Sequence, residues 1–266
     1  MSDTEPPGGK RPTPLWRTLL YILLPIVGLG LLVAAFVFAL SGRSGPVDLR
    51  ADLDAGTSLS VQVPNAAISL EPSSDDQVHV RMAGSFFGNK PTLDVTTTGG
   101  VTEVRGGCRP QIFSRCAITV AVQLPRSLPV TVTGQNGRIT ASALTGRVDL
   151  STTNGAIETD GTVGRVTMQT TNGDIRQSGA TSKIVAAVTT NGSVTLEFAD
   201  APYSVDASST NGAVTVRVPV DGVSYLVSAR TTNGAVNTDA VPSDSTSRRS
   251  ITAETTNGAV TVEALD

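Results

Sequence analysis

The stretch "VDLSTTNGAIETD" (148–160) contains the tetrapeptide Thr-Thr-Asn-Gly, which decides the fold because it recurs along the chain. The same four residues stand at 152–155, 170–173, 189–192, 231–234 and 255–258, Ser-Thr-Asn-Gly stands at 209–212, and a further Asn-Gly pair stands at 136–137. The repeated asparagines are Asn136, Asn154, Asn172, Asn191, Asn211, Asn233 and Asn257, which are separated by 18, 18, 19, 20, 22 and 24 residues. A period of this size indicates repeated units that stack on one another.

Apolar residues keep fixed distances from these asparagines. Six residues before the asparagine, the chain has Val130, Val148, Val166, Val185, Val205, Val227 and Ile251. Three residues after it, the chain has Ile139, Ile157, Ile175, Val194, Val214, Val236 and Val260. Apolar or small residues also stand four before it, so the alternation predicts two short strands per repeat, with these positions facing inward.

The Asn-Gly pair itself lies between the two predicted strands. Asn and Gly adopt positive φ at the lowest cost, so we expect a tight reversal there. The Thr or Ser two residues before the asparagine shares the inward face. We therefore expect hydroxyl and amide side chains of successive repeats to form hydrogen-bonded columns.

Two architectures fit this pattern. In a β-solenoid each coil lies on the previous one, whereas in an antiparallel meander each Asn-Gly is a two-residue hairpin turn. The increase in repeat length from 18 to 24 residues lies entirely after the second strand of each repeat. This favours a solenoid with insertions at one corner. The pattern continues upstream around Asn65 in degraded form. We expect irregular solenoid coils and a cap over 47–130 and the regular repeat solenoid over 131–266.

The N-terminal part predicts a membrane anchor. Residues 18–40 contain no charged side chain, and the run is about as long as the ~20 residues that cross a bilayer. We expect a disordered cytoplasmic tail at 1–14, a transmembrane helix at 15–40 and a linker at 41–46. Basic residues before the helix favour a cytoplasmic N-terminus and an extracellular C-terminal domain. A cleaved signal peptide is the alternative, although its apolar part is normally shorter.

Composition limits the chemistry. The formal charge of −3 and the 16% of charged residues argue against a nucleic-acid-binding protein. Cys108 and Cys116 are the two cysteines, and an extracellular location favours a disulfide between them. With one histidine, His79, and no further cysteine, we expect no metal site and no cofactor.

The segment "AITVAVQLPRSLPVTVTGQNGRITA" (117–141), together with the repeated "TTNGAV", closely resembles the "putative adhesin" family, a domain of unknown function in bacterial surface and envelope proteins. The resemblance covers about residues 47–266. It implies an all-β, right-handed β-helix-like solenoid, often tethered by one membrane helix, and it supplies no catalytic residues.

These observations predict a non-catalytic, adhesin-like interaction or scaffold domain at the bacterial cell envelope, whose partner is an envelope polymer or a surface protein. The alternatives are an envelope-stress sensing or regulatory protein, a spacer without a ligand, and a polysaccharide-active enzyme on a β-helix. Outward charges at fixed offsets are scattered, which disfavours the enzyme. A column of threonines one residue before each asparagine is a further hypothesis for lattice recognition. The sequence does not predict the oligomeric state.

Overall fold

The computed structural model describes residues 15–40, 44–108 and 115–265, in two units: a helix and a β-domain. Helix α1 spans Leu15–Leu40, where the sequence predicts a helix. In the part of the chain that the structure describes, no helix has both the length and the hydropathy of a bilayer span. The expected transmembrane helix is therefore not supported by the structure. The expected tail at 1–14 and part of the linker at 41–46 lie outside the described residues.

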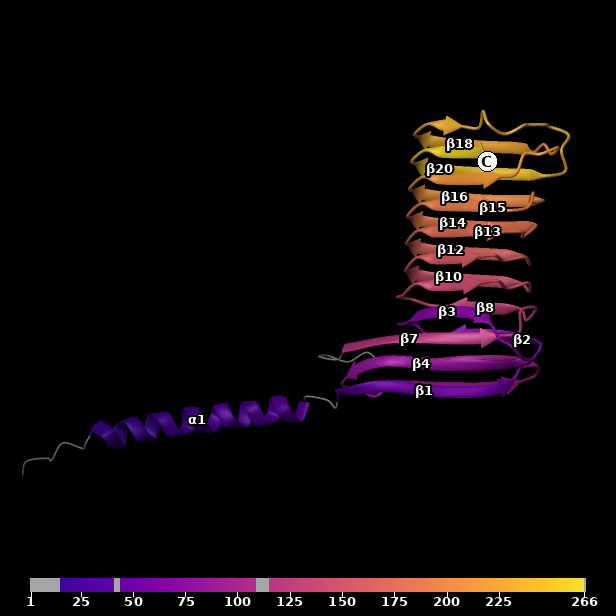
Figure 1. The fold of residues 1–266 in the computed structure, drawn as a ribbon. Helices are drawn as coiled ribbons and strands as arrows, with labels where there is room; N and C mark the ends of the chain where they lie inside the picture. The colour runs from indigo at the N-terminus through magenta and orange to yellow at the C-terminus, as the bar shows by residue number, and fades with distance from the viewer. Residues whose placement is uncertain (1–14, 41–43, 109–114, 266) are drawn as a thin grey trace, which may run out of the picture. The chain divides into compact units, whose positions relative to one another are not determined.

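The β-domain consists of two sheets (Figure 1). Sheet A contains, in spatial order, β1 (Ser44–Asp54), β4 (Gln77–Phe87), β7 (Arg115–Leu124), β3 (Ala67–Pro72), β9 (Ile139–Ser142), β11 (Ile157–Asp160), β13 (Ile175–Ala180), β15 (Val194–Phe198), β17 (Val214–Val218), β21 (Val260–Ala264) and β19 (Val236–Asn237). Sheet B contains, in spatial order, β18 (Leu226–Asn233), β20 (Ser250–Asn257), β16 (Ser204–Asn211), β14 (Ile184–Asn191), β12 (Val166–Asn172), β10 (Val148–Asn154), β8 (Val130–Thr133), β2 (Ser58–Gln62), β6 (Val101–Gly107) and β5 (Thr92–Thr98).

Each repeat places one strand in each sheet, and repeats that are neighbours in the stack pair in parallel. Asn154 lies opposite Asn172 between β10 and β12, and Ile157 lies opposite Ile175 between β11 and β13. Strands that are joined by a two-residue hairpin must be antiparallel, so the meander is excluded. The repeat region is a stack of coils, as the solenoid prediction requires.

The inward positions of the pattern form the core. The residues six before and three after each asparagine are buried in all coils except that of Asn233, where Val227 is partly exposed and Val236 is 46% exposed. That coil lies at the end of both sheets, so its inward side chains have neighbours on one side only. Burial of the branched side chains, at about 25 cal/mol per Å² of apolar surface, is the main stabilising contribution.

The Asn-Gly corner differs from the tight reversal expected from the sequence. None of the repeated asparagines has positive φ, and among the described non-glycine residues only Ala143 does. Six of the asparagines are instead the last residues of strands of sheet B, Asn136 lies beyond the end of β8, and their amides bond from coil to coil. Asn172 Nδ2 donates to Asn154 Oδ1 at 2.8 Å, and Asn191 Nδ2 donates to Asn172 Oδ1 at 2.8 Å. Seven such bonds of 2.6–2.9 Å join Asn65, Asn136, Asn154, Asn172, Asn191, Asn211, Asn257 and Asn233, in that spatial order.

The glycine is required by the neighbouring coil. A Cβ on Gly173 would lie 2.1 Å from the carbonyl oxygen of Gly155, and a Cβ on Gly155 would lie 2.0 Å from that of Gly137. These are backbone atoms that cannot move aside. The glycine at each corner therefore permits the coils to approach to the normal strand spacing of about 4.8 Å.

The buried hydroxyls also bond differently from the expected hydroxyl column. Thr170 Oγ1 donates to the carbonyl oxygen of Gly155 at 3.0 Å, and Thr189 Oγ1 donates to that of Gly173 at 2.9 Å. The hydroxyls of Ser209, Thr255 and Thr231 make the same contact with the glycine of the adjoining coil. Each of these five hydroxyls is satisfied by backbone rather than by another hydroxyl, because stacking in register brings it beside that carbonyl, whereas Thr152 Oγ1 has no hydrogen-bond partner in the described structure.

The order of the last coils departs from chain order. The C-terminal coil, β20 and β21, lies between the coil of β16 and β17 and the coil of β18 and β19. Asn257 accordingly donates to Asn211, and Asn233 donates to Asn257. The segments 219–225 and 238–249 make the two long connections.

The N-terminal part of the domain is less regular than the repeat region. β2 and β3 form a coil that pairs in parallel with β8 and β9, so the repeat around Asn65 belongs to the stack. β1, β4 and β7 then pair antiparallel in sheet A, and β5 and β6 pair antiparallel in sheet B. These strands end the stack on the N-terminal side.

One core position predicts a stabilising substitution. Gln177 is 2% exposed, and neither polar atom of its amide has a hydrogen-bond partner in the described structure. Leu196 lies opposite it in β15. Replacement by leucine removes an unsatisfied buried amide, so Gln177→Leu should raise the free energy of unfolding by about 1–3 kcal/mol.

Urea denaturation followed by circular dichroism measures this change. Gln169→Leu is the control, because Gln169 is exposed and its replacement should have an effect within about 0.5 kcal/mol. A lower stability of Gln177→Leu would show that the amide is hydrogen-bonded in the folded protein.

Candidate functional site

The outer face of sheet A carries two grooves lined by polar side chains. The first, of about 360 Å³, crosses β1, β4, β7 and β3. The second, of about 530 Å³, crosses β9, β11, β13, β15 and β17. Because side chains alternate between the two faces of a sheet, most residues that line the grooves belong to the outward set, and the buried residues Val80, Val122, Ala141, Thr159 and Gln177 complete the lining.

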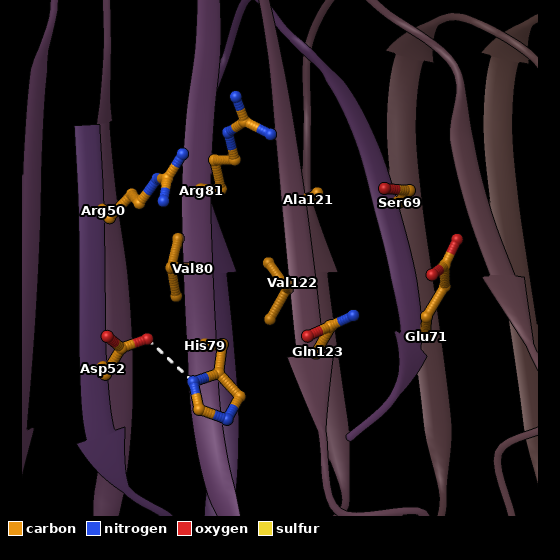
Figure 2. Close-up of a pocket in the computed structure, with 10 residues that line it drawn as sticks. All are labelled: Arg50, Asp52, Ser69, Glu71, His79, Val80, Arg81, Ala121, Val122 and Gln123. Atoms are coloured by element: carbon orange, nitrogen blue, oxygen red, sulfur yellow. Dashed lines mark hydrogen bonds and ion pairs between the residues drawn. The ribbon is translucent and has the colours of Figure 1, made fainter. Parts of the chain in front are cut away.

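The first groove is built from two rows of residues in register (Figure 2). One row runs across the four strands through Asp52, His79, Gln123 and Glu71. The other row runs through Arg50, Arg81, Ala121 and Ser69. Alanine lies between two longer side chains in the second row, so Ala121 forms the floor of the groove.

His79 is held between two carboxylates. Its Nδ1 lies 2.7 Å from Asp52 Oδ1, and its Nε2 lies 3.0 Å from Asp75 Oδ1. These hydrogen bonds, first to Asp52 and then to Asp75, raise the pKa of His79 above its ordinary value of 6.5. The bonds to the backbone of Gln77 and to His79 lower the pKa of Asp75. The cluster therefore favours the imidazolium, which can donate at both ring nitrogens.

Two guanidinium groups share one carboxylate in the neighbouring row. Arg81 Nε donates to Asp48 Oδ1 at 3.1 Å, and Arg50 Nη2 donates to Asp48 Oδ2 at 3.3 Å. The bond from Arg81 and then that from Arg50 lower the pKa of Asp48. Two positive charges facing one negative charge leave N–H donors directed toward solvent beside the groove.

The opposite wall is polar and free of internal partners. In the described structure, the side chains of Ser69, Gln123 and Glu71 make no hydrogen bond or ion pair with the rest of the chain, and Figure 2 shows them around Ala121. Because these side chains have no hydrogen-bond partner in the described structure, they are available to a ligand. The wall thus offers a hydroxyl, an amide and a carboxylate.

The second groove follows the regular coils. Its charged lining alternates in sign along the stack, from Glu158 to Arg176, Glu197 and Arg217. Glu158 pairs with Arg138 at 2.9 Å and Arg217 pairs with Glu263 at 2.6 Å, whereas Arg176 and Glu197 make no ion pair among the described residues. Thr140, Ser142, Ser178 and Thr195 add hydroxyls. The groove is a polar track parallel to the direction of stacking.

The state of His79 gives a testable prediction. Because folding raises its pKa, the His79 ion pairs stabilise the protein below the unfolded-state pKa near 6.5, and this contribution is lost as the pH rises through the folded pKa. His79 is the only histidine, so a proton NMR titration reads it directly. We expect a midpoint above 6.5 in the native protein and a lower one in Asp52→Asn. A midpoint at or below 6.5 would contradict the cluster.

The residues singled out from the sequence serve mainly the fold. Cys108 and Cys116 form a disulfide with Cα atoms 6.3 Å apart, and most of the loop between them lies outside the described residues. The asparagines form the amide ladder. The threonines one residue before them, Thr153, Thr171, Thr190, Thr210, Thr232 and Thr256, are exposed and their side chains make no hydrogen bond within the described structure. In the described residues, no group of three or more His, Cys, Asp or Glu side chains is placed to hold a metal ion.

The groove residues themselves were not identified from the sequence. They come from four strands, of which β1, β4 and β7 pair antiparallel and β3 pairs in parallel with β7, and no repeated motif marks them. The alternation in "QVHVRM" places His79 on the outer face, but it does not identify Asp52 or Asp75 as its partners. The outward charges of the second groove show no regular order at fixed distances from the asparagines. In the folded protein they alternate in sign from one coil to the next.

A stack of two-strand coils with parallel pairing, an internal asparagine ladder and grooved polar outer faces defines the class of repetitive β-solenoid domains. Residues 126–264, more than half of the chain, match the model of the Toastrack family, DUF4097. The chain belongs to the Toastrack family. No curated protein matches it.

Solved bacterial structures resemble the chain at low identity. A "putative cell adhesion protein" from Clostridium sporogenes is 13% identical, with a TM-score of 0.38 over 83% of this chain and 100% of that chain. A "putative adhesin" from Bacteroides fragilis is 13% identical, with a TM-score of 0.45 over 82% of this chain and 97% of that chain. A "putative lipid binding protein" from Parabacteroides distasonis is 10% identical, with a TM-score of 0.30 over 85% of this chain and 98% of that chain.

Proposed function

We propose that this protein is a non-catalytic, adhesin-like interaction domain of the bacterial cell envelope, which binds an extended envelope polymer or surface protein along the outer face of sheet A. The observation that carries the proposal is the presence, along this face, of polar side chains that have no hydrogen-bond or ion-pair partner among the described residues: Ser69, Gln123, Glu71, Arg176 and Glu197. The repeated Asn-Gly residues form contacts between coils: the asparagine amides hydrogen-bond to one another, and the glycines allow close approach of the backbones.

The paired charges of the first groove favour binding over catalysis there. A general acid or base needs a proton or a lone pair that is free to transfer. His79 has a carboxylate at each ring nitrogen, and Asp48 faces two guanidinium groups. A regulatory role in envelope stress would use the same face with a partner protein, and the experiment below distinguishes the kinds of partner.

Location at the membrane is the part of the proposal that rests on the sequence alone. Residues 18–40 carry no charge, and the basic residues before them favour a cytoplasmic N-terminus. Carbonate extraction of membranes and protease treatment of intact cells test it. Release of the protein by carbonate, or protection of residues 44–265 from external protease, would contradict it without affecting the binding proposal.

Binding to isolated envelope fractions tests the function. The purified full-length protein is incubated separately with peptidoglycan, surface glycans and membrane proteins, with heat-denatured protein as the control. We expect saturable binding to one fraction, and a loss of affinity of about 10-fold or more in Glu71→Ala or Arg176→Ala, since one hydrogen bond to a charged group contributes about 1.5–3 kcal/mol.

Gln169→Ala is the matched control on the outer face of sheet B and should bind as the native protein does. Glu71 and Arg176 make no ion pair in the described structure, so their replacement should leave the thermal midpoint unchanged. Failure to bind any fraction, or equal binding by all three variants, would overturn the proposal.

A further inference from the structure

The side-chain hydrogen bonds at the Asn-Gly corner, unlike the backbone bonds between coils, all run in one direction. In each of the seven asparagine contacts, the amide nitrogen donates toward the N-terminal end of the stack and the amide oxygen accepts from the other side. The five hydroxyl contacts to glycine carbonyls have the same direction. The stack therefore has a donor side and an acceptor side, and each coil presents acceptors to the coil that follows it in space.

The acceptor end of the stack has no following coil. β18 and β19 are the last strands of their sheets. Asn233 donates to Asn257, but in the described structure its own Oδ1 accepts no hydrogen bond, and the carbonyl of Gly234 receives no hydroxyl. The donor end differs, because the antiparallel strands β1, β4 and β5 lie beyond the first coil.

The backbone of β18 is also open on this side. The N–H of Tyr225 donates to Pro242 O, and its carbonyl accepts from the N–H of Asp244, so the loop covers the outer edge at Tyr225. The N–H of Leu226 instead bonds inward to Arg249. Since strand residues alternate in direction, the backbone groups of residues 227, 229 and 231 face outward with no strand beside them in the described structure.

The core is exposed at the same place. Val236 is 46% exposed, whereas Val260, its counterpart in the next coil inward, is fully buried. Val227 and Ala229 are partly buried, whereas Ile251 and Ala253 opposite them are fully buried. This end of the stack thus combines unpaired backbone groups in the described structure with two free acceptors, Asn233 Oδ1 and Gly234 O. Its apolar side chains have no strand packed over them.

We propose that this end is a docking edge for a parallel β-strand of another polypeptide that carries a Ser/Thr-x-Asn-Gly sequence. Such a strand places an asparagine amide on Asn233 Oδ1 and a hydroxyl on Gly234 O, and its apolar residues six and four before the asparagine cover Val227 and Ala229. Each of these contacts is already made inside the stack, where coil follows coil. The edge thus recognises the chemistry of the repeat itself.

The direction of the side-chain hydrogen bonds along the stack indicates the kind of partner. A second intact copy presents the same acceptor end, or an N-terminal end closed by antiparallel strands, and neither supplies the amide and hydroxyl donors. A strand of another repeat protein with its donor side free supplies both. Addition of a strand to an open sheet edge is a general mode of peptide recognition.

Peptide binding to the full-length protein tests the proposal. The probe is a fluorescein-labelled peptide with the sequence of residues 250–264, SITAETTNGAVTVEA, and the control peptide has valine in place of the first threonine of Thr-Thr-Asn-Gly and alanine in place of its asparagine. Fluorescence anisotropy should show saturable binding of the probe and binding at least 10-fold weaker for the control.

Two protein variants test whether the probe binds at the edge formed by β18 and β19. Ala229→Pro removes one outward N–H, a change that edge strands tolerate, and Val236→Lys puts a charge on the exposed apolar position. Both should weaken probe binding at least 10-fold at an unchanged thermal midpoint, and Gln169→Ala should not. Absence of probe binding, equal binding of the two peptides, or full binding by both edge variants would overturn the proposal. Self-association of the native protein in sedimentation velocity, lost in Val236→Lys, would also overturn it, because the occupant would then be a second copy.

Discussion

Gly173→Ala should unfold the β-domain or lower its free energy of unfolding by more than about 4 kcal/mol, a loss that is exceptional for the addition of one methyl group. The Cβ would lie 2.1 Å from the carbonyl oxygen of Gly155 and 2.5 Å from its carbonyl carbon. Relief requires two coils to separate, which breaks backbone hydrogen bonds and amide contacts on both sides of the corner. Typical domains have only about 5–15 kcal/mol of total stability.

Gly134→Ala is the matched control, since it makes the same chemical change at a site with room. Its Cβ would lie 3.4 Å from Thr152 Oγ1, its nearest contact, and its φ is not in the left-handed region. We expect a change near zero or a small gain of about 0.4–1 kcal/mol from the reduced entropy of the unfolded chain. Thermal and urea denaturation followed by circular dichroism give both values. Equal stability of the two variants would contradict close stacking at the Asn-Gly corner.

Ile157→Asn should lower the free energy of unfolding by about 3–5 kcal/mol. Ile157 is fully buried between Ile139 and Ile175, its counterparts in the adjoining coils. The substitution removes a large branched side chain from the core and buries an amide that has no partner there. The amide cannot escape to solvent, because its neighbours above and below occupy the same inward column.

Val163→Asn is the control for this prediction. Val163 lies in the corner segment between β11 and β12 and is 45% exposed, so the amide can remain in water. We expect a change within about 0.5 kcal/mol. If Ile157→Asn melted at the same temperature as Val163→Asn, the position three after the asparagine would not face the core.

Much of the fold could be predicted from spacing because strands have a period of two and stacked coils align equivalent residues. The inward positions around Asn154 and Asn172 follow from the alternation of valine, leucine and isoleucine alone. The φ of the asparagine is ordinary, and the asparagines are joined through their amides. The role of the glycine depends on the distance to the next coil. The sequence of a single repeat does not show this distance.

The order of the coils could not be predicted. The coils that end in Asn233 and Asn257 carry the same Thr-Thr-Asn-Gly sequence, so either fits beside the coil of Asn211. Long connections at 219–225 and 238–249 allow the chain to skip one level and return to fill it. Chemically equivalent repeats specify that coils stack, but they do not specify which coil is the neighbour of which.

The candidate site was less accessible to sequence reasoning than the fold. Asp52, His79, Gln123 and Glu71 meet in one row because β1, β4, β7 and β3 pair in an order unlike their order in the chain. Each of these residues alone is an ordinary outward strand residue. Their partners follow from the register of the strand pairs, which is antiparallel from β1 to β7 and parallel between β7 and β3, and which depends on tertiary packing rather than on a local motif.

The most direct test of the in-register stack is oxidative cross-linking of paired cysteines on the outer face of sheet B. Asp206 lies opposite Thr252, which lies opposite Ser228, so Asp206 and Ser228 are two strand spacings apart, about 10 Å. A disulfide bridges Cα atoms up to about 7 Å apart. The structure predicts an intramolecular cross-link in the full-length Asp206→Cys, Thr252→Cys variant and none in the Asp206→Cys, Ser228→Cys variant. A cross-link in the second variant and none in the first would show that the coils stack in chain order, which would contradict the inserted C-terminal coil and the ladder that runs through Asn257.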